Sequence, residues 1–196
     1  IRIYNTIIKL SRKGDVSGEA LRYVGKIYFD QVAPVYESHM SVKLQGGNVG
    51  ALQASLQQIF TSLVELEKEY SKVFATKDAN WSSIAFYHLG NAYEEFSTQL
   101  LNPPGIEGAK IKDVKAQLKG TVSQVLKKSL SYYKQGYETA RKFKVYNKYV
   151  ALLQAKKSKL EKKGIMFEEW VLHSDVVASF VSDKLYSQLK RGKVIR

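Results

Sequence analysis

The chain has 196 residues, with 31 lysine and arginine residues against 18 aspartate and glutamate residues, and it contains no cysteine. This length suffices for one sizeable domain, the lack of cysteine excludes disulfides, thiolate metal sites and cysteine nucleophiles, and no apolar run is long enough to span a bilayer. The formal net charge of +13 favours an acidic partner, which is an acidic protein, a nucleic acid, an anionic lipid or an anionic polysaccharide.

Apolar residues recur at three- and four-residue spacing along almost the whole chain, so the sequence predicts an all-α fold. Residues 1–17 are expected to be the end of a preceding helix followed by a polar turn. Because the chain begins at Ile1, we expect it to be a piece of a longer protein. The predicted helices after that turn span residues 19–44, 49–75, 81–101, 113–143, 148–162 and 167–189, and residues 191–196 form a basic tail.

Local signals mark several ends of these predicted helices. Pro34 lies inside the first of them and should kink it, whereas Asn48 should cap the second. The Asn-Pro-Pro-Gly segment at 102–105 should end the third, and Gly164 should end the fifth. The elements group into a single domain of three helix pairs, over residues 18–76, 80–145 and 146–190, the last being a pair or a capping helix.

Two segments 65 residues apart share a pattern of a large apolar residue, then Leu or Val, then Gly, then Tyr, all on one face of a helix. The two copies are Leu21…Val24-Gly25…Tyr28 and Phe86…Leu89-Gly90…Tyr93. A glycine inside a helix costs about 1 kcal/mol relative to alanine. We therefore expect a neighbouring helix to approach closely at Gly25 and at Gly90.

These two segments resemble the first helix of a tetratricopeptide repeat (TPR), and Ser129…Tyr133…Gly136 resembles the second. The longer run from Ala85 to Phe96, followed by Pro103-Pro104, is similar to the large TPR proteins of deltaproteobacterial adventurous gliding motility and of the cell envelope. The resemblance covers residues 18–163. It implies a TPR-like α-solenoid with elongated helices, a non-catalytic scaffold, and a place in the periplasm or cell envelope.

The resemblance also implies that a ligand lies along the surface made by the first helices of the pairs. The residues that flank the two glycines are then expected to line this surface, and they are Arg22, Lys26, Phe29, Tyr87, Asn91 and Glu94. Tyr87 stands where the carboxylate-holding clamp of some repeats has a basic residue, so such a clamp is incomplete in this chain.

Lysine is concentrated between residues 110 and 163, where tyrosines are interleaved with it. We take Lys127, Lys134 and Arg141 as candidate contact residues in this segment. Basic groups among aromatic rings can bind nucleic acid through phosphate contacts and base stacking. An acidic protein or an anionic polysaccharide would be attracted as well, and any single lysine can simply be a solvated residue.

No pattern predicts a catalytic residue, a metal ligand or a cofactor site, so we do not expect an enzyme. His39, His88 and His173 are far apart in the sequence, and the glycines at 46–50 lack the spacing of a phosphate-binding loop. The carboxylates are expected on solvated helix faces, and they are Glu65, Glu67, Glu69, Glu94 and Glu95. The sequence thus predicts a scaffold that binds an acidic protein or peptide, with a basic nucleic-acid-binding helical protein as the alternative, and it leaves the oligomeric state open.

Overall fold

The computed structural model describes residues 2–11 and 17–171 of the chain, and this part is helical apart from turns and one isolated bridge. The all-α prediction is confirmed. The helices are α1 (Arg2–Ser11), α2 (Gly18–Ser41), α3 (Val49–Ala75), α4 (Ala79–Leu101), α5 (Ile111–Lys142) and α6 (Lys148–Val171).

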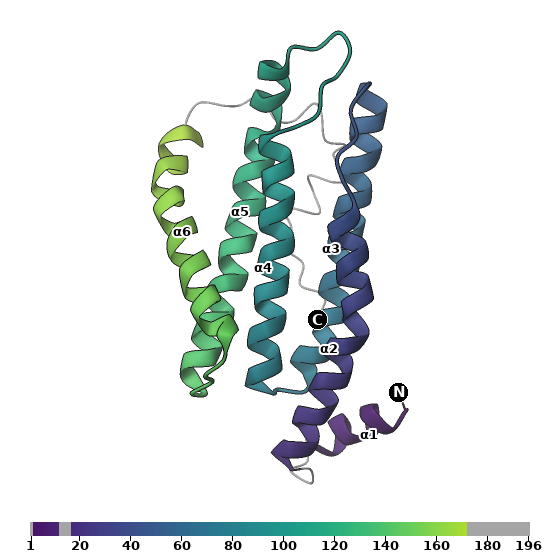
Figure 1. The fold of residues 1–196 in the computed structure, drawn as a ribbon, viewed down its shortest axis with the longest axis vertical. Coiled ribbons are helices and arrows are strands. Elements are labelled where there is room, and N and C mark those ends of the chain that lie inside the picture. Colours follow the sequence, from purple (N-terminus) through teal and green to yellow (C-terminus); the bar gives the residue numbers. More distant parts are fainter. Residues whose placement is uncertain (1, 12–16, 172–196) are drawn as a thin grey trace.

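The five long helices lie along one axis and form an elongated bundle, with the short α1 crossing at one end (Figure 1). The helices α2 and α3 form one hairpin, and α4 and α5 form a second with the most extensive contact in the bundle. The first hairpin packs on the second mainly through α4, and α6 packs on α5 and α4. In the part of the chain that the structure describes, no helix is both long and apolar enough to cross a membrane.

Side-chain caps explain where three of the long helices begin. The side-chain oxygens of Ser17, Asn48 and Asp78 each accept a hydrogen bond from the backbone N–H three residues later. Such caps satisfy donors that have no partner inside the helix. The predicted cap at Asn48 is therefore confirmed.

The helix α2 continues through Pro34 and ends at Ser41, three residues earlier than predicted. The chain leaves the helix at Val42 because the backbone groups beyond it have partners elsewhere. The N–H of Leu44 donates to Gln99 of α4 at 2.9 Å, and the N–H of Gln45 donates to Ser55 of α3 at 3.0 Å. These contacts tie the α2–α3 turn to both neighbouring helices.

The glycines at 46–47 form a turn that interlocks with the loop between α4 and α5. The N–H of Gly47 donates to the carbonyl of Gly105 at 2.9 Å, and the carbonyl of Gly47 accepts from the N–H of Glu107 at 2.8 Å. A Cβ on Gly46 would lie 2.5 Å from the Gly105 carbonyl oxygen. Since the Gly47 amide is already bonded, this segment is an interhelix turn and not an anion-binding loop.

The main hydrophobic core lies between α2, α3, α4 and α5. Its largest fully buried side chains include Tyr70 and Phe96. A second, smaller cluster joins α5 to α6 through Tyr133, Leu153 and Leu160. Over residues 148–162, α6 therefore packs on the bundle through this small cluster and not through the main core.

Both repeated glycines are buried, as predicted, but their neighbours differ. A Cβ on Gly25 would lie 3.0 Å from the Trp81 ring, at the start of α4. A Cβ on Gly90 would lie 2.5 Å from the ring of Tyr133, in the middle of α5. The two copies of the sequence pattern thus meet different partners in the fold.

The prediction that Gly164 ends a helix is wrong, because α6 continues through it to Val171. One glycine costs a helix only about 1 kcal/mol, which is too little to stop it. The polar turn at residues 12–16, the part of the predicted helix 167–189 beyond Val171, and the basic tail lie outside the described residues.

Candidate functional site

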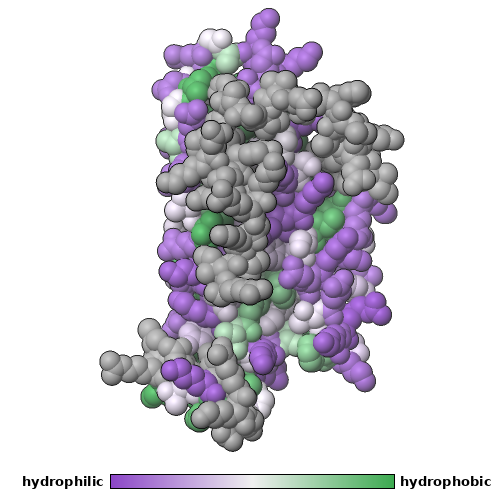
Figure 2. All heavy atoms as spheres, turned by 180° about the vertical axis from the view of Figure 1, so that it is seen from behind, coloured by the Kyte–Doolittle hydropathy of each residue, from purple (hydrophilic) through white to green (hydrophobic). Residues whose placement is uncertain are grey.

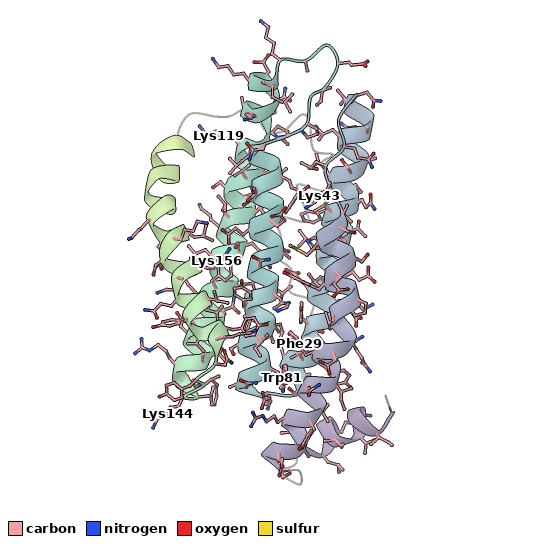
Figure 3. All side chains as sticks on the ribbon, viewed as in Figure 1. Phe29, Lys43, Trp81, Lys119, Lys144 and Lys156 are labelled. Atoms are coloured by element: carbon pink, nitrogen blue, oxygen red, sulfur yellow. The ribbon has the colours of Figure 1, made fainter. Side chains whose placement is uncertain are left out.

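Side chains from α2, α4 and α6 meet along one side of the bundle, and they include most of the polar residues that sequence analysis placed on the first helices. We call this surface the α2–α4–α6 face and define it by Phe29, Tyr36, Tyr87, His88, Asn91, Glu94, Tyr149 and Lys156. Each of these residues is half-buried, so each keeps part of its surface in solvent. Figure 3 shows Phe29 and Lys43 near the α2–α4 seam and Lys156 between α4 and α6.

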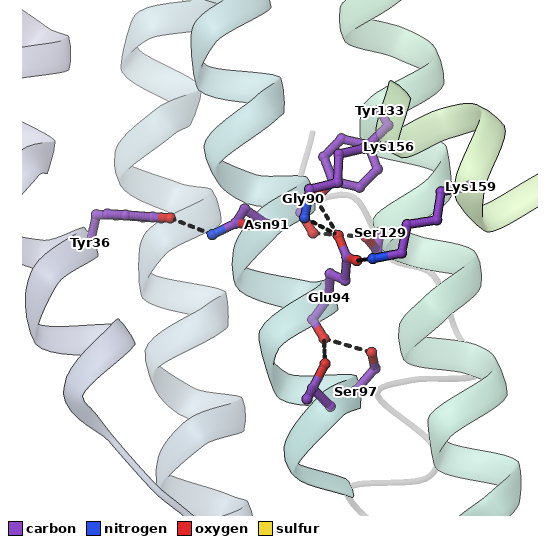
Figure 4. A network of polar contacts seen from close by, with 10 residues as sticks. Tyr36, Gly90, Asn91, Glu94, Ser97, Ser129, Tyr133, Lys156 and Lys159 are labelled. Carbon is purple, nitrogen blue, oxygen red and sulfur yellow. Dashed lines mark hydrogen bonds and ion pairs between the residues drawn. The ribbon is translucent and has the colours of Figure 1, made fainter. Parts of the chain in front are cut away.

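Polar contacts join α2 to α4 along this face. The Asn91 Nδ2 donates a hydrogen bond to the hydroxyl oxygen of Tyr36 at 2.9 Å (Figure 4). Just beyond the end of α2, the Lys43 Nζ lies 3.1 Å from a Glu95 carboxylate oxygen of α4. The register between α2 and α4 is therefore held by side-chain pairs as well as by the core.

An aromatic cluster surrounds His88, which projects from α4. Its ring centroid lies 4.6 Å from that of Tyr36 and 5.2 Å from that of Phe29, both on α2. On the other side, Tyr87 and Tyr149 have ring centroids 5.2 Å apart, and Tyr149 lies 5.8 Å from His88. The cluster thus spans all three helices of the face.

This aromatic environment keeps His88 neutral at physiological pH. Burial among the rings lowers the pKa of its imidazole from 6.5 to about 4, because the charged form loses solvation that aromatic neighbours do not replace. His88 therefore acts in this fold as a packing residue and not as a proton donor or acceptor near neutral pH.

Glu94 is the polar centre that joins α4 to α5 and α6. Its side chain is 13% exposed, and its carboxylate lies 2.8 Å from the Lys156 Nζ and 3.3 Å from the Lys159 Nζ. The hydroxyl of Tyr133 donates to the same carboxylate at 2.9 Å (Figure 4). Burial by itself would raise the pKa of Glu94, but hydrogen bonds from Lys156 and Tyr133 and the two lysine charges outweigh it and hold the pKa below its ordinary value.

A second carboxylate, Glu67 of α3, connects α3 to α4 and α5, and its side chain is 29% exposed. It accepts hydrogen bonds from the hydroxyls of Tyr93 and Tyr132, the former at 2.8 Å, and pairs with Lys128 at 3.3 Å. Burial, and then the nearby Glu67 charge, raise the pKa of both tyrosines. The expectation of a solvated helix face is wrong for Glu94, because a tyrosine hydroxyl and two lysines from other helices enclose its carboxylate. Glu67 keeps part of its surface in solvent while it bonds to groups on two other helices.

Four of the nine candidate contact residues lie on the α2–α4–α6 face, and these are Phe29, Tyr87, Asn91 and Glu94. Arg22 and Lys26 are exposed on α2, nearer its start, and Lys26 pairs with Asp30 at 2.6 Å. The polar groups of Asn91 and Glu94 already have partners inside the fold, so in this arrangement they support the face structurally.

The three candidates on α5 lie apart from that face. Lys127 is exposed, Lys134 pairs with Glu161 of α6 at 3.1 Å, and the Arg141 guanidinium lies over the ring of Tyr137 at 5.9 Å. The fold therefore brings four of the nine candidates together on one face and leaves the other five outside it.

Four members of the face were not among the candidate contact residues, and these are Tyr36, His88, Tyr149 and Lys156. Tyr36 follows Phe29 by seven residues, which places the two on the same side of α2, so periodicity could have identified it. Tyr149 and Lys156 reach the face only because α6 folds back against α4, and no local signal reports that packing.

The described residues contain no group of three or more His, Asp or Glu side chains close enough to hold a metal ion. What the face offers is a row of half-exposed rings with lysines beside it. Such a row can make apolar and cation-assisted contacts to another chain.

Comparisons of the chain with protein-family models, with curated proteins and with solved structures found no match. A function can therefore be proposed only from the residues and contacts of this chain itself.

Proposed function

We propose that the chain is a non-catalytic, TPR-like helical scaffold that binds an acidic segment of a partner protein along the α2–α4–α6 face. The observation that carries this proposal is the row of half-exposed aromatic side chains, contributed by three helices of the bundle and bordered by lysines. Aromatic rings supply contact area at low entropic cost, and lysines attract and orient an acidic chain.

The packing order of the helices supports a repeat-like scaffold. The helix α2 contacts both α3 and α4, and α4 contacts both α5 and α6. Each hairpin therefore packs on the element that follows it in the chain, which is the neighbour-to-neighbour packing on which helical repeats depend.

The charge left on the face after internal pairing supports an acidic ligand. Two lysines converge on the single carboxylate of Glu94, so this group of three carries a net positive charge. The side chains of Lys159 and Lys43 are 55% and 59% exposed, respectively. Both ammonium groups can therefore approach a carboxylate on a partner without leaving the fold.

Figure 2 shows the molecule from behind, where the visible described residues are mostly hydrophilic with hydrophobic ones between them. We place the partner site on the α2–α4–α6 face because the aromatic cluster and the exposed side chains of Lys43 and Lys159 meet there.

The test is selection of peptides from a random displayed library on the immobilised protein, followed by affinity measurements on variants. We expect the selected peptides to combine Asp and Glu with large apolar residues, and to bind more weakly as salt rises. Replacing Phe29 or Tyr87 by Ala should weaken binding about ten-fold or more, in the range of an interface hot spot.

The matched control is Tyr23→Ala, which removes a ring from the same helix α2 at a side chain that is 63% exposed. Tyr23 lies about a third of a turn around the helix from Phe29, away from the face. Selected peptides without acidic residues, or a loss of binding as large for Tyr23→Ala as for Phe29→Ala, would reject the proposed site.

Exposed lysines on α5 favour nucleic-acid binding as a second candidate. Lys112, Lys115 and Lys127 are exposed and have no carboxylate within 4 Å among the described residues. A mobility-shift assay with generic DNA and RNA at low salt separates this candidate from the first, since no retardation would remove it. The proposed place in the cell envelope or in a gliding complex rests on the sequence resemblance alone.

A further inference from the structure

The turn between α5 and α6 exposes two aromatic side chains at one end of the bundle. Tyr146 is 90% exposed, more than any other large hydrophobic side chain in the described residues, and Phe143 is 59% exposed. Both lie within the seven residues from Lys142 to Lys148. Neither ring contributes to the core, so packing gives no reason for an aromatic residue at either position.

Cations surround these two rings. The side chains of Arg141, Lys142, Lys144 and Lys148 are all exposed, and none has a carboxylate within 4 Å among the residues that the structure describes. The Lys142 Nζ lies 5.4 Å from the centroid of the Phe143 ring. The nearest acidic residue in the sequence is Glu138, about one helical turn before Lys142.

Backbone hydrogen bonds give this turn a defined shape. The N–H of Val145 donates to the carbonyl of Ala140 at 2.9 Å, and the N–H of Lys144 donates to the carbonyl of Arg141 at 3.3 Å. Lys144 has a left-handed backbone conformation, with a φ of 53°. These features make a Schellman motif. The rings and cations are therefore presented by an ordered turn, at little entropic cost to a binding event.

The turn also lies beside the turn between α3 and α4, in which Lys77 is followed by the capping residue Asp78. The Asn147 Nδ2 donates to the Asn80 side-chain oxygen at 2.8 Å, which joins the α5–α6 turn to the start of α4. Lys77, three residues before Asn80, is exposed in the turn between α3 and α4. Figure 3 shows Lys144 at the tip of the α5–α6 turn, directed away from the helices.

We propose that this end of the bundle, which we call the basic–aromatic tip (Lys77, Arg141, Lys142, Phe143, Lys144, Tyr146 and Lys148), docks onto the surface of an anionic lipid bilayer. Tyrosine and phenylalanine rings enter the headgroup region of a membrane, while the long lysine stems keep their ammonium groups among the lipid phosphates.

A bilayer suits this tip better than a nucleic acid does. The two rings and four of the cations lie within the eight residues from Arg141 to Lys148, so a lipid surface that meets this turn meets them together. Single-stranded nucleic acid is held by grooves in which successive bases stack on rings, whereas these two rings lie on a protruding turn. Docking through the tip would leave the α2–α4–α6 face, along the side of the bundle, open to a protein partner.

The test is co-sedimentation of the full chain with vesicles of phosphatidylcholine alone or of phosphatidylcholine mixed with phosphatidylglycerol. We expect binding to the mixed vesicles only, and binding that weakens as salt rises. The double variant Lys142→Gln, Lys144→Gln should bind about ten- to thirty-fold more weakly, since each basic residue near an anionic surface contributes about five-fold.

Two further variants separate the tip from the overall charge. Phe143→Ser with Tyr146→Ser keeps every cation and should still weaken binding about five-fold or more. Lys112→Gln with Lys115→Gln removes the same charge from exposed positions at the other end of α5 and should change binding much less. Equal losses for the two lysine pairs would overturn the proposal, because binding would then follow net charge alone.

A fluorescent reporter gives an independent readout. Tyr146→Trp should show a blue-shifted emission on addition of mixed vesicles, beyond any change in the parent protein, because the indole enters the headgroup region. An unchanged spectrum would overturn the proposal. Retardation of single-stranded DNA that the tip variants abolish, without vesicle binding, would assign the tip to nucleic acid instead.

Discussion

Gly90 leaves no room for a methyl group in the contact between α4 and α5. A Cβ there would lie 2.5 Å from the Tyr133 ring, which is fully buried, and the Gly90 carbonyl already accepts a hydrogen bond from Ser129 at 2.7 Å. Neither the ring nor the helix backbone can move freely, because both are packed on other sides.

We expect Gly90→Ala to lower the free energy of unfolding by about 1–3 kcal/mol, the usual cost of overpacking, although alanine is the better helix former. Urea denaturation measures this change. The control is Gly18→Ala, since a Cβ at Gly18 would meet no atom within 4 Å. A Gly90→Ala protein as stable as the Gly18→Ala protein would show that the close approach is absent.

His88 makes the stability of the fold depend on pH. Its pKa is about 4 in the folded chain against 6.5 for an ordinary histidine, so the unfolded chain binds the proton more tightly. The contribution of neutral His88 is therefore fully present above the unfolded pKa and is lost as the pH falls from 6.5 towards 4.

The variant His88→Phe should flatten this pH dependence, and the difference between the two curves should reach about 1–3 kcal/mol. Thermal or urea unfolding at a series of pH values measures it. His39, whose pKa burial also lowers, stays in both proteins, so its effect cancels in the comparison. Parallel curves for the two proteins over this range would contradict the assignment.

At the scale of elements, one carboxylate of α4 forms two of the ion pairs that attach α6. Glu94 receives Lys156 and Lys159 from α6 and the Tyr133 hydroxyl from α5. Its neighbour Glu95 is more exposed, at 36%, and pairs with the single exposed lysine Lys43. Glu94 is enclosed and Glu95 lies nearer the surface, so substitutions at these two adjacent carboxylates can be compared directly.

We expect Glu94→Gln to destabilise the protein by about 1–3 kcal/mol, because the buried Tyr133 and the partly buried Lys156 lose a charged acceptor. Glu95→Gln should cost less than about 1 kcal/mol, as exposed ion pairs do. Urea denaturation measures both. Equal costs for the two substitutions would show that the Glu94 network contributes no more than a surface ion pair.

At the scale of the whole molecule, the helices α2 to α5 share one core, whereas α6 packs on them through a separate cluster. Over residues 148–162, where the side chains of α6 are described, Leu153 and Leu160 are its buried hydrophobic residues, and they lie in this small cluster with Tyr133. Regions with few buried apolar contacts open at lower free energy than the core.

Native-state hydrogen exchange should therefore report lower opening free energies for the amides of α6 than for those of α3 and α4. The buried residues Leu63 and Leu89 of the core are 0% and 1% exposed, respectively, and their helices set the upper reference. Protection in α6 equal to that in α4 would show that the bundle unfolds as one unit.

Most helix positions could be predicted from the sequence because the signals are local. Asn48 caps α3, the Asn-Pro-Pro-Gly segment ends α4 near its predicted position, and the apolar spacing of α3 matches its observed range. The predicted end of α2 was three residues too late, because contacts with α3 and α4 end this helix at Ser41. The predicted end of α6 at Gly164 was wrong, because one glycine is too weak a signal to stop the helix.

The α2–α4–α6 face could be predicted only in part. Phe29 and Asn91 were identified because they flank the repeated glycines, and their positions on α2 and α4 follow from helical periodicity. The contact of Asn91 with Tyr36 depends on the register between two helices. Periodicity within one helix contains no information about that register.

The amino-acid sequence by itself determined that the described part of this chain is all-helical, where most of its helices begin, and that Gly25 and Gly90 lie at helix contacts. Only the tertiary structure decided that Gly25 meets Trp81 while Gly90 meets Tyr133, that Glu94 is enclosed, and that Glu67 bonds to hydroxyls of two other helices. The physical reason is that helix formation depends on neighbours within a few residues, whereas burial of a carboxylate depends on which distant lysines and tyrosines the packed helices bring to it.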